Sequence, residues 1–172
     1  RISTRDEQGG EAWEITAEGG KKSEIAPSSH PKGTQIEVRD LFFATPARLK
    51  FMKSDRAEFM AVKDVLTRLS MTFHNVSFFL DHDGKKSLNL PAVLDSGSRL
   101  ASILGKEFGQ NSLKIEAERE GVKLHGFAGL PTLDRGTSQF QYLFVNGRPV
   151  RDKLIHGCVR AAYADVLARH RH

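Results

Sequence analysis

Two segments of the sequence contain residue types suited to contacts with phosphate groups and nucleotide bases. In one of them, Asn146-Gly147 is a strong turn signal, because both residues tolerate a positive φ. Arg148, Arg151 and Lys153 follow, and their spacing places them just before and within the first turn of a final helix. Long cations placed in this way can converge on a phosphate backbone, with salt-dependent contacts that carry little sequence information. Arg160 lies further along the same helix, where it either joins these contacts or is only solvated.

The other segment begins with Gly33-Thr34. Glycine allows close approach of the backbone to a ligand, and a threonine hydroxyl can bond to a phosphate-linked water or to a base edge. The residues alone favour a simpler interpretation, in which a strand starts after a glycine turn.

The common catalytic and metal-binding signatures are absent from the sequence, including the phosphate loop, the nucleophile elbow and Cys-x-x-Cys. Only His170 and His172 lie close together among the histidines, and a frayed terminus explains them more simply than a metal pair. His82 stands between two aspartates in a predicted turn, which favours a solvated loop. Cys158 is the single cysteine, so a disulfide framework is excluded, and we expect it to be buried on the apolar face of the final helix.

Hydrophobic periodicity predicts the elements that position these residues. Residues 11–26 are typical of two short strands around Gly19-Gly20. A strand that starts at Gly33 should bury Ile36 and Val38 on one face.

A short helix and a long helix should follow this strand. Thr45-Pro46 is typical of a helix start, with Thr45 as the cap. In this turn we expect Phe51 to pack inward and Arg48 to be paired. Apolar residues at spacings of three and four then predict a long helix over 55–73.

The remaining elements are predicted from turn signals and short apolar runs. A hairpin over 76–90 should turn at residues 81–84, and Pro91 with the polar stretch 95–98 is the best candidate for a domain boundary. The second half should contain a short helix over 99–104 and a final helix over 152–168. Between them we expect three strands, over 113–118, 122–130 and 139–145.

The positive charge is concentrated near the end of the chain. The 172 residues contain 26 Lys and Arg against 21 Asp and Glu, a net charge of +5. Residues 145–172 account for +4 of this excess, with six basic and two acidic side chains. An anionic partner for this segment is one explanation, and a solvated helix face is the other. No run of residues is long and apolar enough for a membrane span, and we expect no signal peptide from the polar first residues.

The two segments together closely resemble the MutL family of DNA mismatch repair proteins. The resemblance rests on Gly33-Thr34 followed by Leu-Phe and by Thr-Pro-Ala-Arg-x-Lys-Phe, and on Val-Asn-Gly-Arg before a basic helix. It implies an α+β fold, with the C-terminal part of a GHKL-type ATPase sandwich in residues 1–92. A ribosomal-protein-like α/β second domain, transducer-like, DNA-binding and truncated at its C-terminus, would then occupy residues 93–172.

The resemblance also implies roles for particular residues. Thr34, with Gly33, would lie beside the adenine of ATP. The basic surface of Arg148, Arg151, Lys153 and Arg160 would bind double- or single-stranded DNA without sequence preference.

Some of the family's catalytic parts are missing from the sequence. The Asn and Glu of an early helix, the Asp-x-Gly-x-Gly segment and the second-domain lysine have no equivalent here. We therefore expect an internal fragment without catalytic residues of its own, and no ATP hydrolysis by these residues alone, although the parent protein would be a weak ATPase that uses ATP and Mg.

The implied function of the parent is to couple mismatch recognition to repair in the bacterial cytoplasm, associated with the nucleoid during repair. It would act as a homodimer, with a mismatch-recognition protein and a downstream nuclease or helicase as partners. Two alternatives remain: a small α/β RNA- or DNA-binding module without ATPase ancestry, and an interaction domain whose basic face meets an acidic protein.

Overall fold

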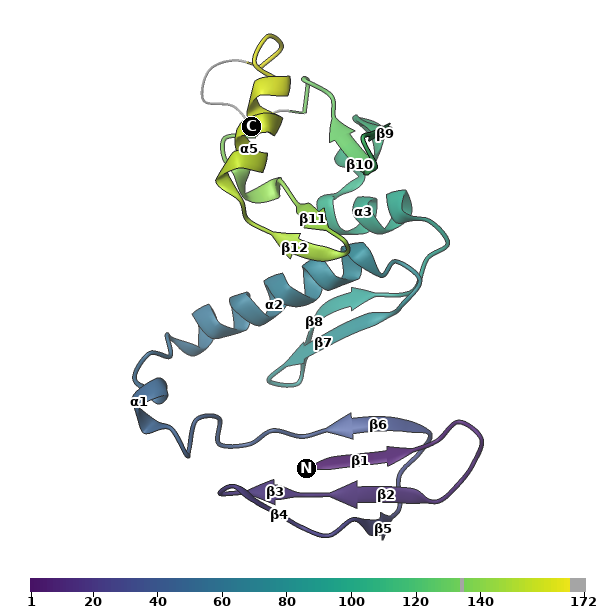
Figure 1. Ribbon diagram of the computed structural model, residues 1–172, viewed down its shortest axis with the longest axis vertical. Coiled ribbons are helices and arrows are strands. Elements are labelled where there is room, and N and C mark those ends of the chain that lie inside the picture. Colours follow the sequence, from purple (N-terminus) through teal and green to yellow (C-terminus); the bar gives the residue numbers. More distant parts are fainter. Residues whose placement is uncertain (134, 168–172) are drawn as a thin grey trace. The chain divides into compact units, whose positions relative to one another are not determined.

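The computed structural model describes residues 1–133 and 135–167. The chain divides into two compact units, Arg1–Ser54 and Asp55–His172 (Figure 1). Compactness and family ancestry are different properties, so the domain boundary expected between residues 92 and 93 stays a prediction.

The first unit is built around an antiparallel four-stranded sheet in the order β5-β2-β1-β6. Its strands are β1 (Ile2–Arg5), β2 (Ala12–Ile15), β5 (Ala26–Ser28) and β6 (Gly33–Ile36). The short strands β3 (Ala17–Glu18) and β4 (Lys21–Lys22) pair around Gly19-Gly20, and both glycines have positive φ, as the turn prediction requires. The sequence prediction missed β1.

The predicted burial of one face of β6 is wrong. Ile36 and Val38 are 67% and 71% exposed. A sheet face is buried only when a second layer packs on it. Within Arg1–Ser54, all of which the structure describes, the helical content is the single turn α1 (Pro46–Leu49), and β6 is an edge strand.

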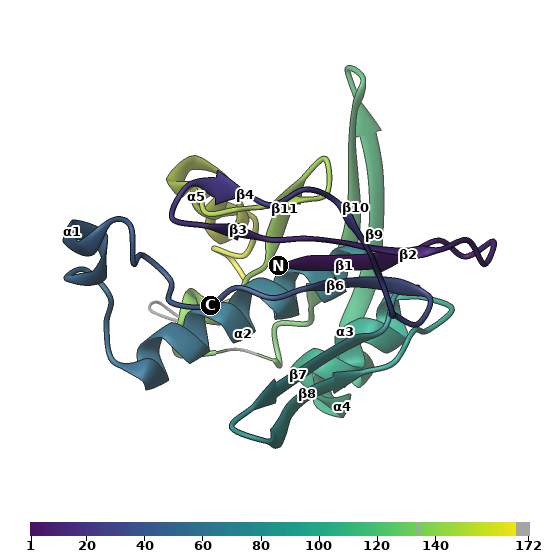
Figure 2. The same cartoon turned by 90° about the horizontal axis from the view of Figure 1, so that it is seen from below.

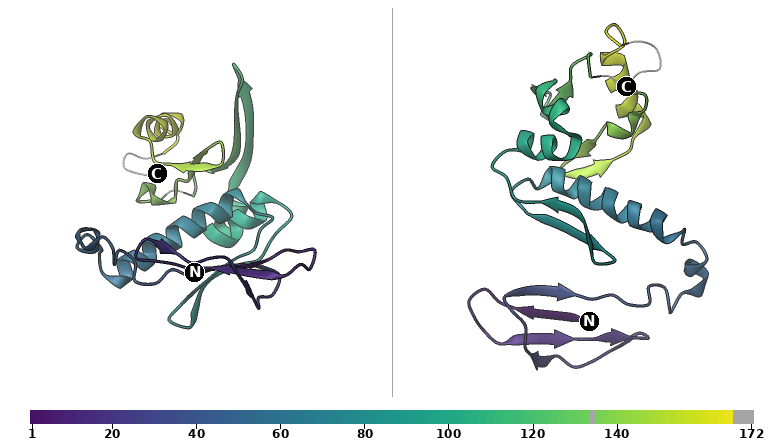
Figure 3. Two further views of the ribbon diagram at one scale, coloured as in Figure 1. Left: turned by 60° about the horizontal axis from the view of Figure 1, so that its bottom comes forward. Right: turned by 180° about the vertical axis from the view of Figure 1, so that it is seen from behind.

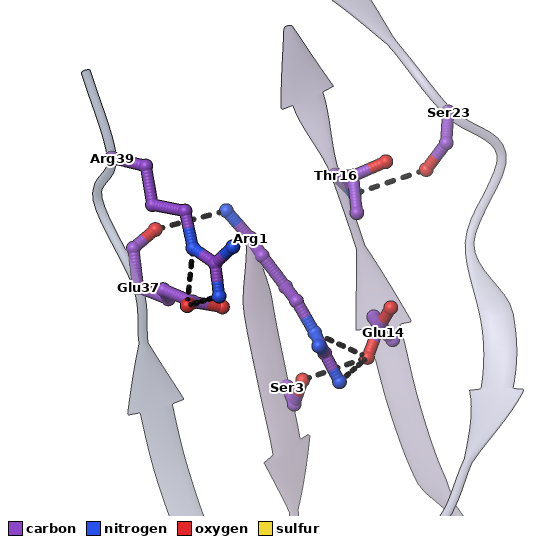
Figure 4. A network of polar contacts seen from close by, with 7 residues as sticks. All are labelled: Arg1, Ser3, Glu14, Thr16, Ser23, Glu37 and Arg39. Carbon is purple, nitrogen blue, oxygen red and sulfur yellow. Dashed lines mark hydrogen bonds and ion pairs between the residues drawn. The ribbon is translucent and has the colours of Figure 1, made fainter.

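Polar side chains cross this sheet. Arg1 and Ser3 both donate to Glu14, which joins β1 to β2, and Arg39 forms an ion pair with Glu37 after β6 (Figure 4). The hydrogen bond and the charge of Arg39 lower the pKa of Glu37.

Helix α1 starts at Pro46 as predicted, but its flanking side chains behave differently. The Thr45 side chain makes no capping hydrogen bond, although Thr45 is the N-cap residue. Phe51 is 83% exposed, so the expected inward packing is wrong. The Arg48 guanidinium lies 5.8 Å from the centre of the Phe42 ring, which gives it an aromatic partner.

In the second unit, the long helix and the hairpin after it agree with the sequence prediction. Helix α2 (Asp55–Thr72) is followed by β7 (Phe78–His82) and β8 (Lys85–Leu90), which pair antiparallel around Asp83-Gly84. Helix α2 contacts β7 and α3 (Figure 3).

The rest of the second unit alternates short helices and hairpins. Asp95 caps α3 (Ser96–Leu104) by accepting a hydrogen bond from the Ser98 amide, and Gly105 ends it at φ +95°. Helix α4 (Lys106–Gln110) was not predicted. Strands β9 (Ser112–Arg119) and β10 (Val122–Gly129) form the long hairpin seen in Figure 2. The elements after it are a 3₁₀ turn (Ser138–Phe140), β11 (Leu143–Val145), β12 (Arg148–Val150) and α5 (Lys153–Ala162).

One expected strand is shorter than predicted. Residues 139–145 contain the 3₁₀ turn Ser138–Phe140 before β11 begins at Leu143. Over the described part of the chain, no helix combines the length and the apolar character needed to cross a membrane.

A buried arginine holds α3 against the end of α2. Arg99 is 1% exposed, and its Nη2 donates to the carbonyl oxygens of His74 at 2.9 Å and Val76 at 2.7 Å. The guanidinium thus satisfies two carbonyl groups of the segment that leads from α2 to β7, and burial lowers its pKa.

Replacement of Arg99 by Met should destabilise the protein, because it removes the donor to the Val76 carbonyl and one of the two donors to the His74 carbonyl, which also accepts from the Val93 amide. We expect the free energy of unfolding, measured by urea denaturation, to fall by about 1–3 kcal/mol. Arg119→Met is the matched control, since the Arg119 side chain is 90% exposed. Equal losses in the two variants would contradict a specific role for Arg99.

Candidate nucleic-acid interface

The Asn146-Gly147 turn joins two strands. Asn146 and Gly147 have φ values of +49° and +75°, as expected of a tight hairpin, and β11 pairs with β12 so that Val145 faces Arg148. Arg148 therefore lies on a strand, a position that the sequence prediction did not assign to it. The Thr72 hydroxyl makes a long hydrogen bond of 3.5 Å to the Gly147 carbonyl, which fixes the turn at the end of α2.

The cations after this turn are positioned by the start of α5. The Asp152 carboxylate accepts a hydrogen bond from the Ile155 amide at 3.0 Å, which caps the helix and makes Lys153 its first residue. Lys153 and Arg160 are seven residues apart and both exposed, so they share a helical face. The structure thus gathers the predicted DNA-binding residues on one hairpin and helix, with all four side chains exposed: Arg148, Arg151, Lys153 and Arg160.

The inward face of α5 differs from the predicted one. Its half-buried residues are Ile155, His156 and Val159, and Tyr163 directly after the helix is also half-buried, whereas Cys158 is exposed. Polar contacts fix this rotation of the helix, because the Tyr163 hydroxyl donates to the Gly129 carbonyl at 2.7 Å and His156 bonds to the Gln141 side chain at 3.1 Å. The prediction of a buried Cys158 is therefore wrong, and His156 lies on the inward side of the helix instead.

Arg151 is already paired within the chain. Its Nη2 lies 3.0 Å from Oδ2 of Asp64 on α2, and the same oxygen accepts from Nε of Arg68 at 2.9 Å. The Arg68 guanidinium lies 4.8 Å from the centre of the Tyr142 ring. Asp64 and Arg68 were not among the site residues predicted from the sequence. Their spacing of four on a predicted helix is typical of an ion pair, but no local pattern indicates the contact with Arg151.

The predicted nucleotide-site residues lie in the first unit. Gly33 has φ +119°, and a Cβ atom placed there would meet nothing within 4 Å. Thr34 pairs with Thr4 across β6 and β1, and their hydroxyl oxygens are 2.8 Å apart. Gly33 and Thr34 therefore offer open backbone and a hydroxyl at the start of an edge strand.

The remaining candidates for chemistry have ordinary surroundings. His82 ends β7, where its ring stacks on Phe59 with centres 4.0 Å apart. Residues 1–133 and 135–167 contain no group of three or more His, Cys, Asp or Glu side chains that could hold a metal ion. His170 and His172 lie outside the described residues.

Comparison with known proteins identifies the chain. Residues 100–172 match the family described as DNA mismatch repair protein, C-terminal domain. The DNA mismatch repair protein MutL of Caulobacter vibrioides is 53% identical over 178 residues, a match that covers 100% of this chain and 28% of the relative. MutL of Paramagnetospirillum magneticum is 51% identical and covers 99% of this chain. The chain spans less than a third of the length of these curated relatives.

A solved structure agrees with the sequence relatives. The Aquifex aeolicus MutL ATPase domain complexed with ADP superposes with a TM-score of 0.75 at 28% identity, covering 93% of this chain and 61% of that chain. Fold and sequence together define a protein of the DNA mismatch repair class, with mixed α and β structure. Within that class the chain belongs to the MutL family and corresponds to part of its N-terminal ATPase region. The resemblance drawn from the two sequence segments is confirmed.

Tyr142 should make stability depend on alkaline pH. Burial raises its pKa, and Asp64 adds to this rise while Arg68 and Arg151 oppose it. In the unfolded chain the phenol ionises at about pH 10. Its stabilising effect is therefore complete below that pH, and it is lost as the pH rises through the higher pKa of the folded state.

Tyr142→Phe should accordingly weaken the fall of the unfolding free energy above about pH 10, as measured by urea denaturation. Burial also raises the pKa of Tyr163, so Tyr163→Phe should weaken the same fall of the unfolding free energy. An unchanged pH dependence in Tyr142→Phe would contradict this prediction.

Proposed function

We propose that the parent protein binds ATP and DNA and couples mismatch recognition to downstream repair. The observation that carries the DNA part is the group of exposed cations on β12, on α5 and between them, namely Arg148, Arg151, Lys153 and Arg160. These cations lie within residues 100–172, the range that matches the mismatch repair family. Cations on a rigid hairpin and helix suit phosphate contacts without base readout.

The domain organisation is proposed from the same family relationship. Residues 1–92 form the C-terminal portion of a GHKL-type ATPase sandwich, and residues 93–172 belong to a ribosomal-protein-like, transducer-like second domain. Belonging to the MutL family favours this organisation over a nucleic-acid-binding module without ATPase ancestry.

The nucleotide contact of this chain is assigned to Gly33 and Thr34. An open glycine backbone and a hydroxyl suit a base edge, whereas the described residues provide no cluster of carboxylates for Mg. The ADP of the Aquifex aeolicus relative supports a nucleotide ligand. ATP and Mg would bind the full-length parent, which hydrolyses ATP slowly, and these residues alone would not.

The proposed partners are those of a repair protein. They are DNA, a mismatch-recognition protein, a downstream nuclease or helicase, and a second copy of the parent. The proposed location is the bacterial cytoplasm, at the nucleoid during repair.

Neutralisation of the cations tests the DNA interface. In the full-length parent, Arg148→Gln and Lys153→Gln should each weaken duplex binding, and each should make the slope of log affinity against log salt about 0.9 less steep for every phosphate that is no longer neutralised. Lys123→Gln is the matched control, because the Lys123 side chain is 75% exposed on β10 and loses the same charge. An equal effect of all three variants would show that Arg148 and Lys153 do not form the DNA site.

Removal of the Thr34 hydroxyl tests the nucleotide contact. Thr34→Val keeps the β-branched shape but loses the hydroxyl that is proposed to bond to the nucleotide. ATP should therefore bind the full-length parent about two- to tenfold more weakly, as measured by calorimetry. Thr34→Ser restores a hydroxyl and should recover most of the affinity. If the Val variant bound ATP as tightly as the wild type, Thr34 would have no part in the site.

A further inference from the structure

One carboxylate oxygen serves two arginines that differ greatly in exposure. Oδ2 of Asp64 accepts from Arg68 at 2.9 Å and from Arg151 at 3.0 Å. The side chain of Arg68 is 10% exposed, and that of Arg151 is 72% exposed. The same negative charge therefore holds a buried guanidinium and one that belongs to the predicted DNA surface.

The two ion pairs should differ in how easily they separate. Arg68 is buried against the Tyr142 ring, and separation from Asp64 would leave a buried charge without its partner. Arg151 is mostly in solvent, where an ion pair contributes little to stability. Arg151 is thus the partner that can leave, while Arg68 keeps the carboxylate in place.

A DNA phosphate offers Arg151 the same chemistry as Asp64. Both are anionic oxygen acceptors that a guanidinium binds with charge-assisted hydrogen bonds. A phosphate that approaches Arg151 must also approach the negative charge of Asp64, which is 39% exposed. The carboxylate therefore opposes DNA binding in two ways, by occupying Arg151 and by repelling the phosphate.

We propose that Asp64 is an intramolecular competitor of DNA, which holds Arg151 until a phosphate replaces it. The proposal rests on the DNA-binding function proposed above. Asp64 is then a positioning residue that acts through Arg151. An acidic side chain on helix α2 would thus lower the affinity for DNA.

Asp64→Asn tests the competition in the full-length parent. The variant keeps the shape of the side chain and removes its charge. We expect duplex DNA, measured by fluorescence anisotropy, to bind about two- to fivefold more tightly at low salt, the range that corresponds to one exposed ion pair. The slope of log affinity against log salt should stay close to that of the wild type, because Arg151 neutralises the same phosphate in both complexes. Asp64→Glu keeps the charge and should bind as the wild type does.

A double-mutant cycle separates competition from a general change of charge. In an Arg151→Gln background, Asp64→Asn should give little or no gain in affinity, because the residue through which it acts is gone. Asp83→Asn is the matched charge control, since the Asp83 side chain is 88% exposed in the β7–β8 turn and its removal should leave DNA affinity within a factor of about two.

A second variant covers the case in which Asp64→Asn is too unstable to measure. The combination Asp64→Asn with Arg68→Met removes both members of the buried pair, leaves no buried charge unpaired and keeps the net charge of the wild type. Met can still pack on the Tyr142 ring. This variant should also bind DNA more tightly than the wild type.

Unchanged or weaker binding in these variants would overturn the proposal, and so would an equal gain in the Arg151→Gln background. Failure of the DNA-binding function itself would appear separately, as wild-type affinity in Arg148→Gln and Lys153→Gln. A response to Lys153→Gln without a response to Asp64→Asn would therefore reject only the competition by Asp64.

Discussion

The buried guanidinium of Arg68 is the constraint on which the arrangement of the second unit depends. It is packed on the Tyr142 ring and paired with Asp64, so it joins helix α2 to the segment that leads into β11. Burying a charge is costly unless it is paired and hydrogen-bonded. Helix α2 and strand β11 must therefore keep the relative placement in which Arg68 retains its partners. The Asn146-Gly147 turn also meets α2, at Thr72, so the hairpin is held at two points along this helix.

This attachment gives the basic segment a defined geometry. Arg148 projects from a strand, whereas Lys153 begins a helix that Asp152 caps. A flexible tail with the same charge would attract DNA equally well at long range, but it would lose conformational entropy on binding. The rigid hairpin and helix avoid much of that loss.

Local patterns in the sequence predicted those parts of the fold that local forces determine. The spacing of apolar residues predicted helix α2, and the turn residues predicted the hairpin at Asp83-Gly84 and the turn at Asn146-Gly147, although not the strand β12 that follows this turn. The exposure of Ile36 and Phe51 could not be predicted in this way, because burial depends on whether another layer covers the element. The rotation of α5 depends on distant hydrogen bonds, such as the one from Tyr163 to Gly129.

The candidate site was likewise predictable only in its local parts. The cations and the turn that presents them were visible in the sequence, because both are local. The ion pair of Arg151 with Asp64 joins residues 87 positions apart, so only the folded chain reveals it. The roles of Gly33 and Thr34 came from family resemblance, since their local pattern is also that of an ordinary strand start.

The exposure of Cys158 has a practical consequence. It is the only cysteine of the sequence, and it lies on the helix that carries Lys153 and Arg160. A thiol-reactive fluorophore would attach to this chain at one defined position without any engineered cysteine. Its emission would then report the local environment of α5 directly, as nucleic acid approaches the helix.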